Sequence, residues 1–313
     1  MIAETGEKYW GRYGAAGLLA VDPARGVLLQ HRVGWSHFGG TWGLPGGALH
    51  EGESALVGAL REAQEEAGVP DGAVRARFAR VLDLKIWSYT TVVADVAEPF
   101  DAVISDPESL ALEWVPIDEV EQRPLHPGLA AAWPTLRELL MVHPTIVVDA
   151  ANVMGSVPNG WWKDRASAAE RLQARLSAWA SGGVPSSELE SVRGSANMSE
   201  AGSAVVSKLG LDAVRWYPTV TMVVEGAARA MADADDGAIH ERDGFRRESG
   251  VRIVRAEGHG DDAIIDEADR HAAGGARVVV ITSDRELRGR AEQRGMRTQS
   301  AGWLVKQLDE FGA

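Results

Sequence analysis

The sequence predicts two unlike α/β domains that follow one another along the chain. With 313 residues the chain is longer than most single domains. The pattern of apolar residues changes at His143–Pro144, where a predicted helix stops because proline cannot continue it. Beyond that point apolar strands alternate with helices, which is typical of a parallel sheet covered by helices on both faces. We expect one domain over residues 1–142 and another over residues 143–313.

The first half begins with two apolar strands, over Gly14–Asp22 and Val27–Val33. A loop rich in glycine and aromatic residues follows them. A helix is expected over Ser54–Ala67, and Gly68 is suited to the left-handed conformation that ends a helix. Beyond it, alternating apolar positions predict one long strand over Leu82–Val96. A short strand with a turn and a closing helix follow, over Leu112–Val120 and Leu129–Leu140. The layout is a sheet surrounding a central helix.

The second half opens with a buried strand at Thr145, followed by a loop and a helix over Asp164–Ala180. Residues 181–203 are rich in Gly and Ser, which indicates a loop or insertion. Further strands are expected at Thr219–Gly226, Val251–Gly258 and Arg277–Asp284. The pattern predicts a three-layer α/β domain with a parallel sheet. No glycine-rich G-x-G-x-x-G loop follows the first strand, which argues against a dinucleotide-binding domain.

Composition narrows the class of protein. The sequence is 45% hydrophobic and 25% charged, so each half can bury an ordinary core. It contains no cysteine, which excludes disulfides, thiolate nucleophiles and Cys-ligated zinc. We find neither a signal-like start nor an apolar run of about 20 residues, the length that spans a bilayer. We therefore expect a cytoplasmic protein without a membrane partner.

The charge is unevenly distributed. The net charge of −13 argues against a surface coated for nucleic-acid binding. Residues 1–143 hold 11 Lys and Arg against 20 Asp and Glu, which leaves 21 against 25 in the remainder. That near-neutral remainder contains basic clusters at Arg246–Arg247 and at Arg285, Arg288 and Arg290. A local phosphate-binding face in the second half therefore stays open.

Three carboxylates gather on one side of the predicted helix. At about 100° per residue, Glu62, Glu65 and Glu66 share a face beside an apolar stripe that can pack on a sheet. Side by side they repel each other, and a hard divalent cation such as Mg²⁺ removes that repulsion. The alternative is an acidic face that is simply solvated.

The segment from Gly47 to Val69 resembles the Nudix box. It has Gly47, five residues, Glu53, seven residues, and then Arg61-Glu62, Glu65-Glu66 and Gly68 at the positions that the motif specifies. The preceding Trp42-Gly43-Leu44-Pro45-Gly46 is also similar to the family's approach to the box. The resemblance implies an α/β/α sandwich, with the box forming a loop–helix–loop.

The resemblance also implies roles. Glu62, Glu65 and Glu66 would bind Mg²⁺ or its water, with the Gly46 carbonyl as a further ligand. Glu53 and Arg61 would orient this cluster. The reaction would be attack by water on a diphosphate phosphorus, and the attacking water would need a base. Three carboxylates are candidates for that base: Glu65, Glu108 and Glu113.

The substrate is less visible in the sequence. Several aromatic side chains stand where a nucleobase could stack, although each could equally pack in the core or a loop. These are Trp35, His37, Phe38, Trp87 and Tyr89. Nudix proteins act on oxidised nucleotides, ADP-ribose, dinucleoside polyphosphates, dinucleotide cofactors and capped RNA, and nothing in the sequence selects among them.

A second set of acids follows the predicted strands of the second half. Asp149 ends the first strand, with Asn152 just after it, and Asp284 ends the last. Asp261 and Asp262 stand at the start of a predicted helix, with Asp266 one turn onward as another candidate acid. Carboxyl ends of parallel strands share one edge, where ligands bind. Each acid could instead be an ordinary helix cap.

Together these motifs resemble the NYN branch of PIN-like nucleases, over about residues 144–313. The resemblance implies that Asp149, Asp284 and either Asp261 or Asp262 bind Mg²⁺ or Mn²⁺, with Asn152 supporting the first of them. Trp161, Trp162 and Lys163 could stack on or grip a single strand. They could equally cover the edge of the sheet.

Three hypotheses for the whole chain follow. The first is a pyrophosphohydrolase acting on a small nucleotide, in which a nucleoside diphosphate is linked to another group. The second is an RNA-processing or RNA-binding protein in which the second domain cuts or holds RNA. The third is a nucleotide sensor that regulates the second domain, although no box carboxylate is missing. A homo-oligomer stays open under all three.

Overall fold

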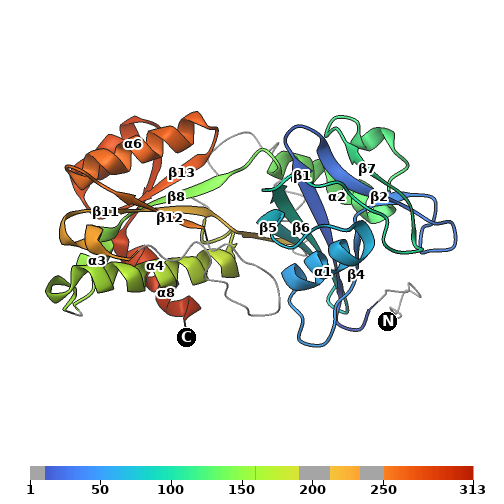
Figure 1. Cartoon of the computed structure of the whole chain (residues 1–313), viewed down its shortest axis with the longest axis horizontal. Helices are drawn as coiled ribbons and strands as arrows, with labels where there is room; N and C mark the ends of the chain where they lie inside the picture. Colours follow the sequence, from blue (N-terminus) through green and yellow to red (C-terminus); the bar gives the residue numbers. More distant parts are fainter. Residues whose placement is uncertain (1–10, 159, 190–211, 233–249, 313) are drawn as a thin grey trace. The chain divides into compact units, whose positions relative to one another are not determined.

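The computed structural model describes residues 11–158, 160–189, 212–232 and 250–312. The chain divides into two compact units (Figure 1). One contains residues 11–141 together with 212–215, and the other contains the remaining described residues. None of the helices within the described ranges is long and apolar enough to cross a membrane.

The first unit is a mixed sheet with two helices. Its elements are β1 (Ala15–Asp22), β2 (Gly26–Arg32), β3 (Trp42–Gly43), β4 (Gly46–Ala48), α1 (Ala55–Ala67), β5 (Val74–Asp83), β6 (Ser88–Val96), β7 (Ser109–Val115), the 3₁₀ helix η1 (Val120–Gln122) and α2 (Pro127–Leu139). The strand order is β3-β2-β1-β6-β5, with β4 paired to β1 and β7 paired to β2. β1 is buried along its whole length, as its apolar sequence predicts, and it runs parallel to β6 and antiparallel to β2 and β4.

Helix α1 begins and ends where the sequence predicts. The Ser54 side chain accepts a hydrogen bond from the Val57 backbone N–H, and Gly68 takes the left-handed conformation at φ 64°. Ala59, Ala63 and Ala67 are fully buried, and α1 packs against β1, β4 and β6. Small side chains at these positions let the helix approach the sheet closely, so its acidic face lies beside β4.

The prediction of one long strand over Leu82–Val96 is wrong. β5 ends at Asp83 and β6 begins at Ser88, and the two pair antiparallel as a hairpin. The turn contains Lys85 at φ 69°, and the Asp83 side chain accepts from its backbone N–H. Alternation continued through this turn because Ile86 is apolar although it is 46% exposed. Neither glycine nor proline marks the break.

The second unit is built on a parallel five-stranded sheet. Its elements are β8 (Pro144–Asp149), α3 (Ala150–Gly155), η2 (Trp161–Lys163), α4 (Arg165–Gly182), β9 (Val184–Pro185), β11 (Thr219–Val224), η4 (Gly226–Ala230), β12 (Val251–Arg255), α6 (Gly260–Ala273), β13 (Arg277–Ile281), α7 (Arg285–Gln293), β14 (Arg297–Gln299) and α8 (Ala301–Phe311). β10 (Asp212–Trp216) precedes β11. The sheet order is β12-β11-β8-β13-β14, and each of these pairs is parallel.

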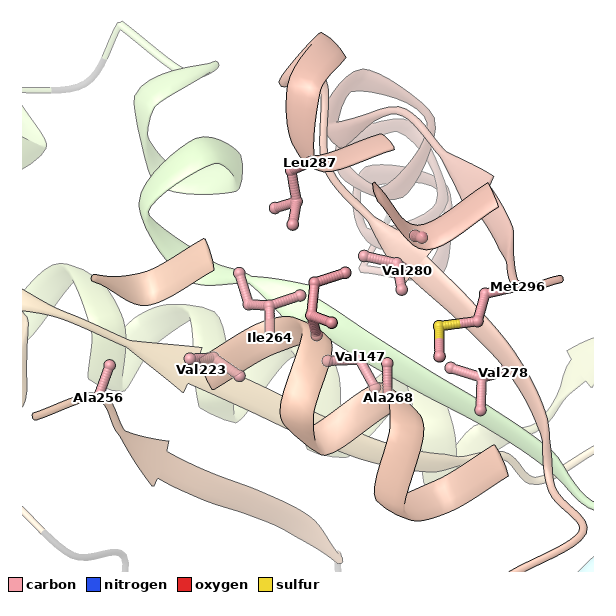
Figure 2. Packing of buried hydrophobic residues seen from close by; sticks show 11 residues of the cluster. Val147, Val223, Ala256, Ile264, Ala268, Val278, Val280, Leu287 and Met296 are labelled. Carbon is pink, nitrogen blue, oxygen red and sulfur yellow. The ribbon is translucent and has the colours of Figure 1, made fainter. Parts of the chain in front are cut away.

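Helices cover the sheet of the second unit on opposite faces, α6 on one and α4 on the other (Figure 1). On the α6 side, Ile264, Ile265 and Ala268 pack on strand residues such as Val147 and Val280 (Figure 2). The first strand, β8, lies in the middle, so the chain leaves it toward β11 on one side and returns to β13 on the other. Sheets with such a reversal of strand order have a crevice at the carboxyl ends of the central strands.

Two sequence expectations fall wholly or partly outside the described residues. The expected insertion over residues 181–203 is described only as far as residue 189, and this part contains the end of α4 and the short strand β9. The basic pair Arg246–Arg247 lies outside the described ranges.

Candidate functional site

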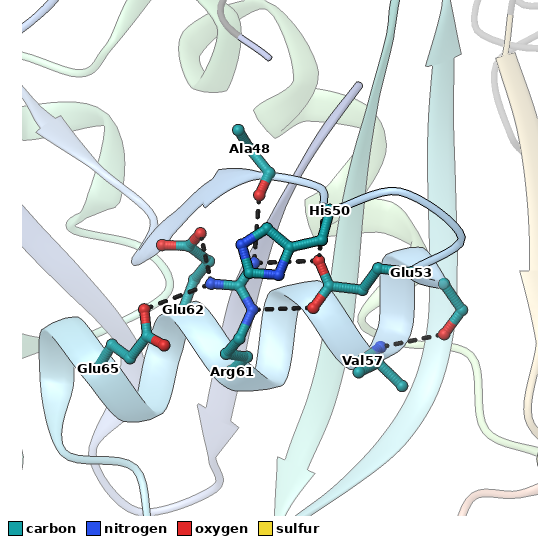
Figure 3. Close-up of polar contacts among 8 residues, drawn as sticks. Ala48, His50, Glu53, Val57, Arg61, Glu62 and Glu65 are labelled. Carbon is teal, nitrogen blue, oxygen red and sulfur yellow. Dashed lines mark hydrogen bonds and ion pairs between the residues drawn. The ribbon is translucent and has the colours of Figure 1, made fainter. Parts of the chain in front are cut away.

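Arg61 connects the carboxylates of the first unit (Figure 3). Its Nε and Nη2 donate to the two carboxylate oxygens of Glu53, at 2.8 and 3.0 Å. Its Nη1 donates to Glu62 at 2.8 Å and to Glu65 at 3.3 Å, and its Nη2 also reaches the Ala48 carbonyl at 3.2 Å. The hydrogen bonds to Glu53 are the main reason that the pKa of Arg61 is raised. This one guanidinium therefore fixes the loop that precedes α1 to the helix.

Glu53 is held from two directions. Besides the two bonds from Arg61, it accepts a hydrogen bond from the His50 backbone N–H at 2.9 Å. Donation by Arg61 is the largest cause of the lowered pKa of Glu53, and the His50 N–H adds to it. Glu53 is therefore held as a carboxylate acceptor for Arg61.

Two glycines bring the backbone of β4 against the carboxylates of α1. The Gly46 N–H donates to Glu66 Oε2 at 2.8 Å. A Cβ at Gly47 would lie 2.6 Å from the Glu62 carboxylate, and one at Gly46 would lie 2.4 Å from the carbonyl oxygen of Ala16. Any side chain at Gly47 would displace Glu62. The glycine pair is thus a condition for seating both carboxylates.

The loop that precedes β7 completes an acidic cluster with Glu66. Carboxylate oxygens of Glu66, Asp106 and Glu108 all lie within 4.8 Å of one another, a spacing that could hold a metal ion. Asp106 is positioned by the Ser109 hydroxyl, which donates to it at 2.8 Å. Asp106 was not among the residues singled out in the sequence. Its only signal was being an acid two residues before the candidate base Glu108.

The electrostatics of this cluster favour a bound cation. Burial raises the pKa of Glu66 to about 7, and the nearby charges of Asp106 and Glu62 act in the same direction. Burial also raises the pKa of Glu62. Clustered carboxylates that are costly to ionise are stabilised by a hard divalent ion, which prefers oxygen ligands. The donor set of Glu66, Asp106 and Glu108 therefore fits such an ion.

Two of the three candidate bases lie elsewhere. Glu65 is 59% exposed and its contact within the box is the long bond from Arg61. Glu113 forms an ion pair with Arg123 at 2.9 Å, and Arg123 in turn stacks over Trp42. Glu108 alone among the three is part of the cluster with Glu66.

The aromatic candidates separate into two groups. His37 and Phe38 pack edge to face, and Phe38 also contacts His126 with ring centroids 4.9 Å apart. Phe38 is 47% exposed and Trp35 is 69% exposed. Burial lowers the pKa of His126 to about 4, so this imidazole is neutral at physiological pH.

The other pair lies in the turn before β6 and at the start of that strand. Trp87 and Tyr89 have ring centroids 6.1 Å apart. Burial raises the pKa of Tyr89 to about 12, and its hydroxyl occupies the space that a side chain at Gly17 would need. Tyr89 is thus a packing residue over β1, whereas Phe38 and Trp35 present rings to solvent.

The second unit has a cleft at the carboxyl ends of its central strands. Four acids line it: Asp149 at the end of β8, Glu225 after β11, Asp261 on α6 and Asp284 after β13. Glu225 was not singled out in the sequence. It accepts a hydrogen bond from the Gly260 N–H at 2.9 Å, which ties the start of α6 to the end of β11.

Asp149 is the most buried of these acids, at 8% exposed. It accepts from the Thr282 hydroxyl at 2.9 Å and from the Asn152 backbone N–H at 3.0 Å. Burial nevertheless raises its pKa, and the charges of Asp261 and Glu225 add to the effect. The Asn152 side chain accepts from the Ser283 N–H at 2.9 Å, so it supports the loop that carries Asp284.

The structure distinguishes Asp261 from its neighbours on α6. Asp261 lines the cleft, and its pKa is raised first by burial and then by the charge of Asp284. Asp262 is 66% exposed and forms an ion pair with Arg290 at 2.6 Å, away from the lining. Asp266 is exposed on the following turn. Of the pair left open by the sequence, Asp261 is therefore the one in the cleft.

Comparison with known proteins identifies the family. The family model described as NUDIX domain matches residues 11–139. A Mycobacterium tuberculosis (strain H37Rv) protein named "Putative 8-oxo-dGTP diphosphatase 3" is 48% identical over 147 residues, which cover 44% of this chain and 67% of that protein. The chain belongs to the Nudix family, a family of hydrolases that use divalent metals, and its first unit carries the Nudix domain.

Other relatives match the same share of the chain. A Bifidobacterium longum protein named nucleoside triphosphate pyrophosphatase/Nudix hydrolase fusion protein is 42% identical over 137 residues, covering 41% of this chain and 28% of that protein. A crystal structure of a Nudix hydrolase from M. smegmatis is 47% identical, with a TM-score of 0.41, and the match covers 44% of this chain and 92% of that one.

We predict that Gly47→Ala lowers Nudix activity without unfolding the domain. The atoms nearest to the new methyl group would be those of the Glu62 carboxylate, which can move, so the acid is displaced and the fold remains. Activity should fall by about 10- to 100-fold, as for other losses of metal-site support. Initial rates at increasing Mg²⁺ measure this. Gly34→Ala is the control, because a Cβ at Gly34 would have no atom within 4 Å. Equal activity of the two variants would contradict the prediction.

A second prediction concerns pH. The carboxyl of Glu66 releases its proton near pH 4.5 when unfolded and near pH 7 in the folded, metal-free unit. The folded state holds the extra proton in that window, so its stability falls as pH rises through it. The loss, complete above pH 7, is at most about 3 kcal/mol. Urea unfolding of EDTA-treated protein at about pH 5 and about pH 8 measures this loss. The free energy of unfolding of Glu66→Gln should change less between these two pH values. Identical pH dependence in both proteins would show that Glu66 titrates normally.

Proposed function

We propose that the Nudix unit is a Mg²⁺-dependent pyrophosphohydrolase that cleaves a nucleoside diphosphate linked to another group. The observation that carries this proposal is the cluster of Glu66, Asp106 and Glu108. The same helix, α1, carries Glu66 and Arg61, and Arg61 bonds to Glu62. We call the contacts of Arg61 with Glu53, Glu62 and Glu65 the Arg61 clamp. Glu62 and the Gly46 carbonyl are the further ligands that we propose, with Glu65 in an outer position.

The chain's own groups have distinct proposed tasks. Glu66 and Asp106 hold the cation, which when bound neutralises the diphosphate and lowers the pKa of water. Glu108 accepts a proton from the attacking water, because it is the one candidate base within the cluster. The water oxygen bonds to phosphorus while the bond to the bridging oxygen breaks, which releases a nucleoside monophosphate. Arg61 and Glu53 keep the carboxylates in place throughout.

For the substrate we propose a purine nucleoside triphosphate, with 8-oxo-dGTP as the first compound to test. The name of the M. tuberculosis relative, a putative 8-oxo-dGTP diphosphatase, supports this choice. Phe38 offers a half-exposed ring beside the neutral His126. Arg32 joins the two regions, because its charge acts on both His126 and Glu66. A nucleotide whose base stacks on Phe38 would then extend its phosphates past Arg32 toward Glu66 and the other acids of the cluster.

We also propose that residues 143–313 form a PIN-like, metal-dependent ribonuclease domain. The observation that favours it is the cleft of four acids at the carboxyl ends of parallel strands. Asp149, Asp261 and Asp284 would hold Mg²⁺ or Mn²⁺, and Glu225 supplies a fourth acid. The Nudix domain would then occupy residues 1–142. The chain divides after Met141, and the described residues 212–215 also group with the first unit.

We predict that Glu66→Gln reduces hydrolysis of the best substrate by more than about 100-fold, because it removes a charge from the proposed metal site. Glu65→Gln is the matched comparison and should lose less activity, since Glu65 is 59% exposed and takes only the outer position. The test is a Mg²⁺-dependent screen of nucleotides and 5′-triphosphate RNA with both variants. Equal losses would place Glu65 in the metal site, and an active Glu66→Gln would remove Glu66 from it.

For the second unit, Asp149→Asn should end Mg²⁺- or Mn²⁺-dependent RNA cleavage and leave nucleotide hydrolysis intact, because Asp149 lies in the other unit. Cleavage of labelled single-stranded RNA, followed on denaturing gels, measures this. The control is Asp266→Asn, because Asp266 is an exposed acid of the same unit. This variant should cleave RNA at the wild-type rate. If nucleotide hydrolysis is lost as well, the two activities are coupled.

A further inference from the structure

A short strip of aromatic and basic residues borders the acidic cleft. It consists of Trp161, Trp162 and Lys163 of η2 together with Arg165 at the start of α4, and we call it the η2 rim. Gly160, at φ 76°, makes the turn that enters it. The sequence left open whether these residues grip a ligand or cover the sheet.

The contacts connect the η2 rim to the cleft at two points. The Trp161 ring lies against Gly155, where a Cβ would be 3.6 Å from its Cζ2, and Gly155 lines the cleft. The Arg165 guanidinium lies over the Trp161 ring at 5.1 Å from its centroid. Its Nη1 would be 3.7 Å from a Cβ at Gly226, the residue after the cleft acid Glu225. The rim therefore borders the cleft.

Exposure and charge indicate what the rim can bind. Trp162 is 58% exposed, an unusual position for the largest apolar side chain, and Lys163 and Arg165 are also exposed. Within the described ranges, neither of these two cations forms an ion pair with a carboxylate. The basic residues of α7 differ: Arg290 pairs with Asp262, and Arg288 faces Glu292 at 3.9 Å. The sequence left open a phosphate-binding face in the second half, and the basic cluster of α7 is already partly neutralised.

We propose that the η2 rim binds an unpaired nucleotide of single-stranded RNA and leads the strand into the cleft. Trp162 stacks on a base, and Arg165 and Lys163 contact the adjoining phosphates. An exposed ring beside unpaired cations suits a single strand, because only unpaired bases present their faces for stacking. A duplex would offer the rim phosphates alone. This inference rests on the proposed nuclease function of the cleft for its substrate, and it concerns different residues.

The test is binding of the full chain to a short fluorescent oligouridine, followed by anisotropy with EDTA present so that no metal-dependent cutting occurs. We expect Trp162→Ala to weaken binding about 5- to 100-fold, the range for loss of one stacked base. Trp162→Phe should recover most of it, because a ring remains. Arg165→Gln should also weaken binding. The slope of log Kd against log salt concentration should fall by about 0.7, the value for one phosphate contact on a single strand.

Lys306→Gln is the charge-matched control, because Lys306 is an exposed cation on α8 that pairs with Glu310. Wild-type affinity in Trp162→Ala and Arg165→Gln would overturn the proposal. So would a wild-type chain that binds no single strand at low salt, or one that binds duplex RNA equally well. Circular dichroism melting of each variant verifies that the second unit is folded.

Cleavage in Mg²⁺ separates this proposal from that for the cleft. Binding that depends on Trp162, in a chain that cuts nothing, would support the rim and remove the nuclease function. Cleavage that is lost in Asp149→Asn but unchanged in Trp162→Ala and Arg165→Gln would support the nuclease function and overturn the proposal for the rim.

Discussion

The first unit depends on the balance of charge around Arg61. Glu53, Glu62 and Glu65 would repel one another on the loop and the helix, and a single half-buried guanidinium bonds to all three. Bidentate pairing with Glu53 gives this contact a fixed geometry, which a lysine could not supply. The clamp requires that β4 approach the helix closely, and Gly47 leaves room there for the Glu62 carboxylate, whereas Gly46 lets β4 pack against the backbone of β1. Within the described ranges, the remaining carboxylate, Glu66, forms no ion pair, and it belongs to the cluster that could hold a metal ion.

The two units gather acids by different structural routes. In the Nudix domain, one helix face meets a loop from a later part of the chain, and burial raises the pKa of the central carboxylate. In the second unit, the reversal of strand order beside β8 brings three strand ends and the start of α6 to one edge. Asp149 is again a buried acid with a raised pKa, partly offset by the Thr282 hydroxyl. Both sites thus contain carboxylates whose ionisation a divalent cation would favour.

Several features could be predicted from the sequence because they are local. Helix α1, its serine cap and its left-handed glycine follow from residues within a few positions of one another. The same holds for the shared face of Glu62 and Glu66 and for the parallel strands of the second unit. The β5–β6 turn was missed because its residues continue the apolar alternation of the strands. Asp262 was retained as a candidate because sequence cannot show that Arg290, on another helix, pairs with it.

The sequence by itself therefore determined the Nudix box, the helix that carries it and the two kinds of domain architecture, since helical periodicity and turn chemistry act over short distances. Only the tertiary structure decided which distant acids join each site. Asp106 and Glu108 reach Glu66 because β7 pairs with β2, and Glu225 reaches the cleft because β11 lies beside β8. No periodicity relates such residues along the chain. Their meeting is fixed by strand pairing and by the packing of α1 and α6, which depend on the whole core of each unit.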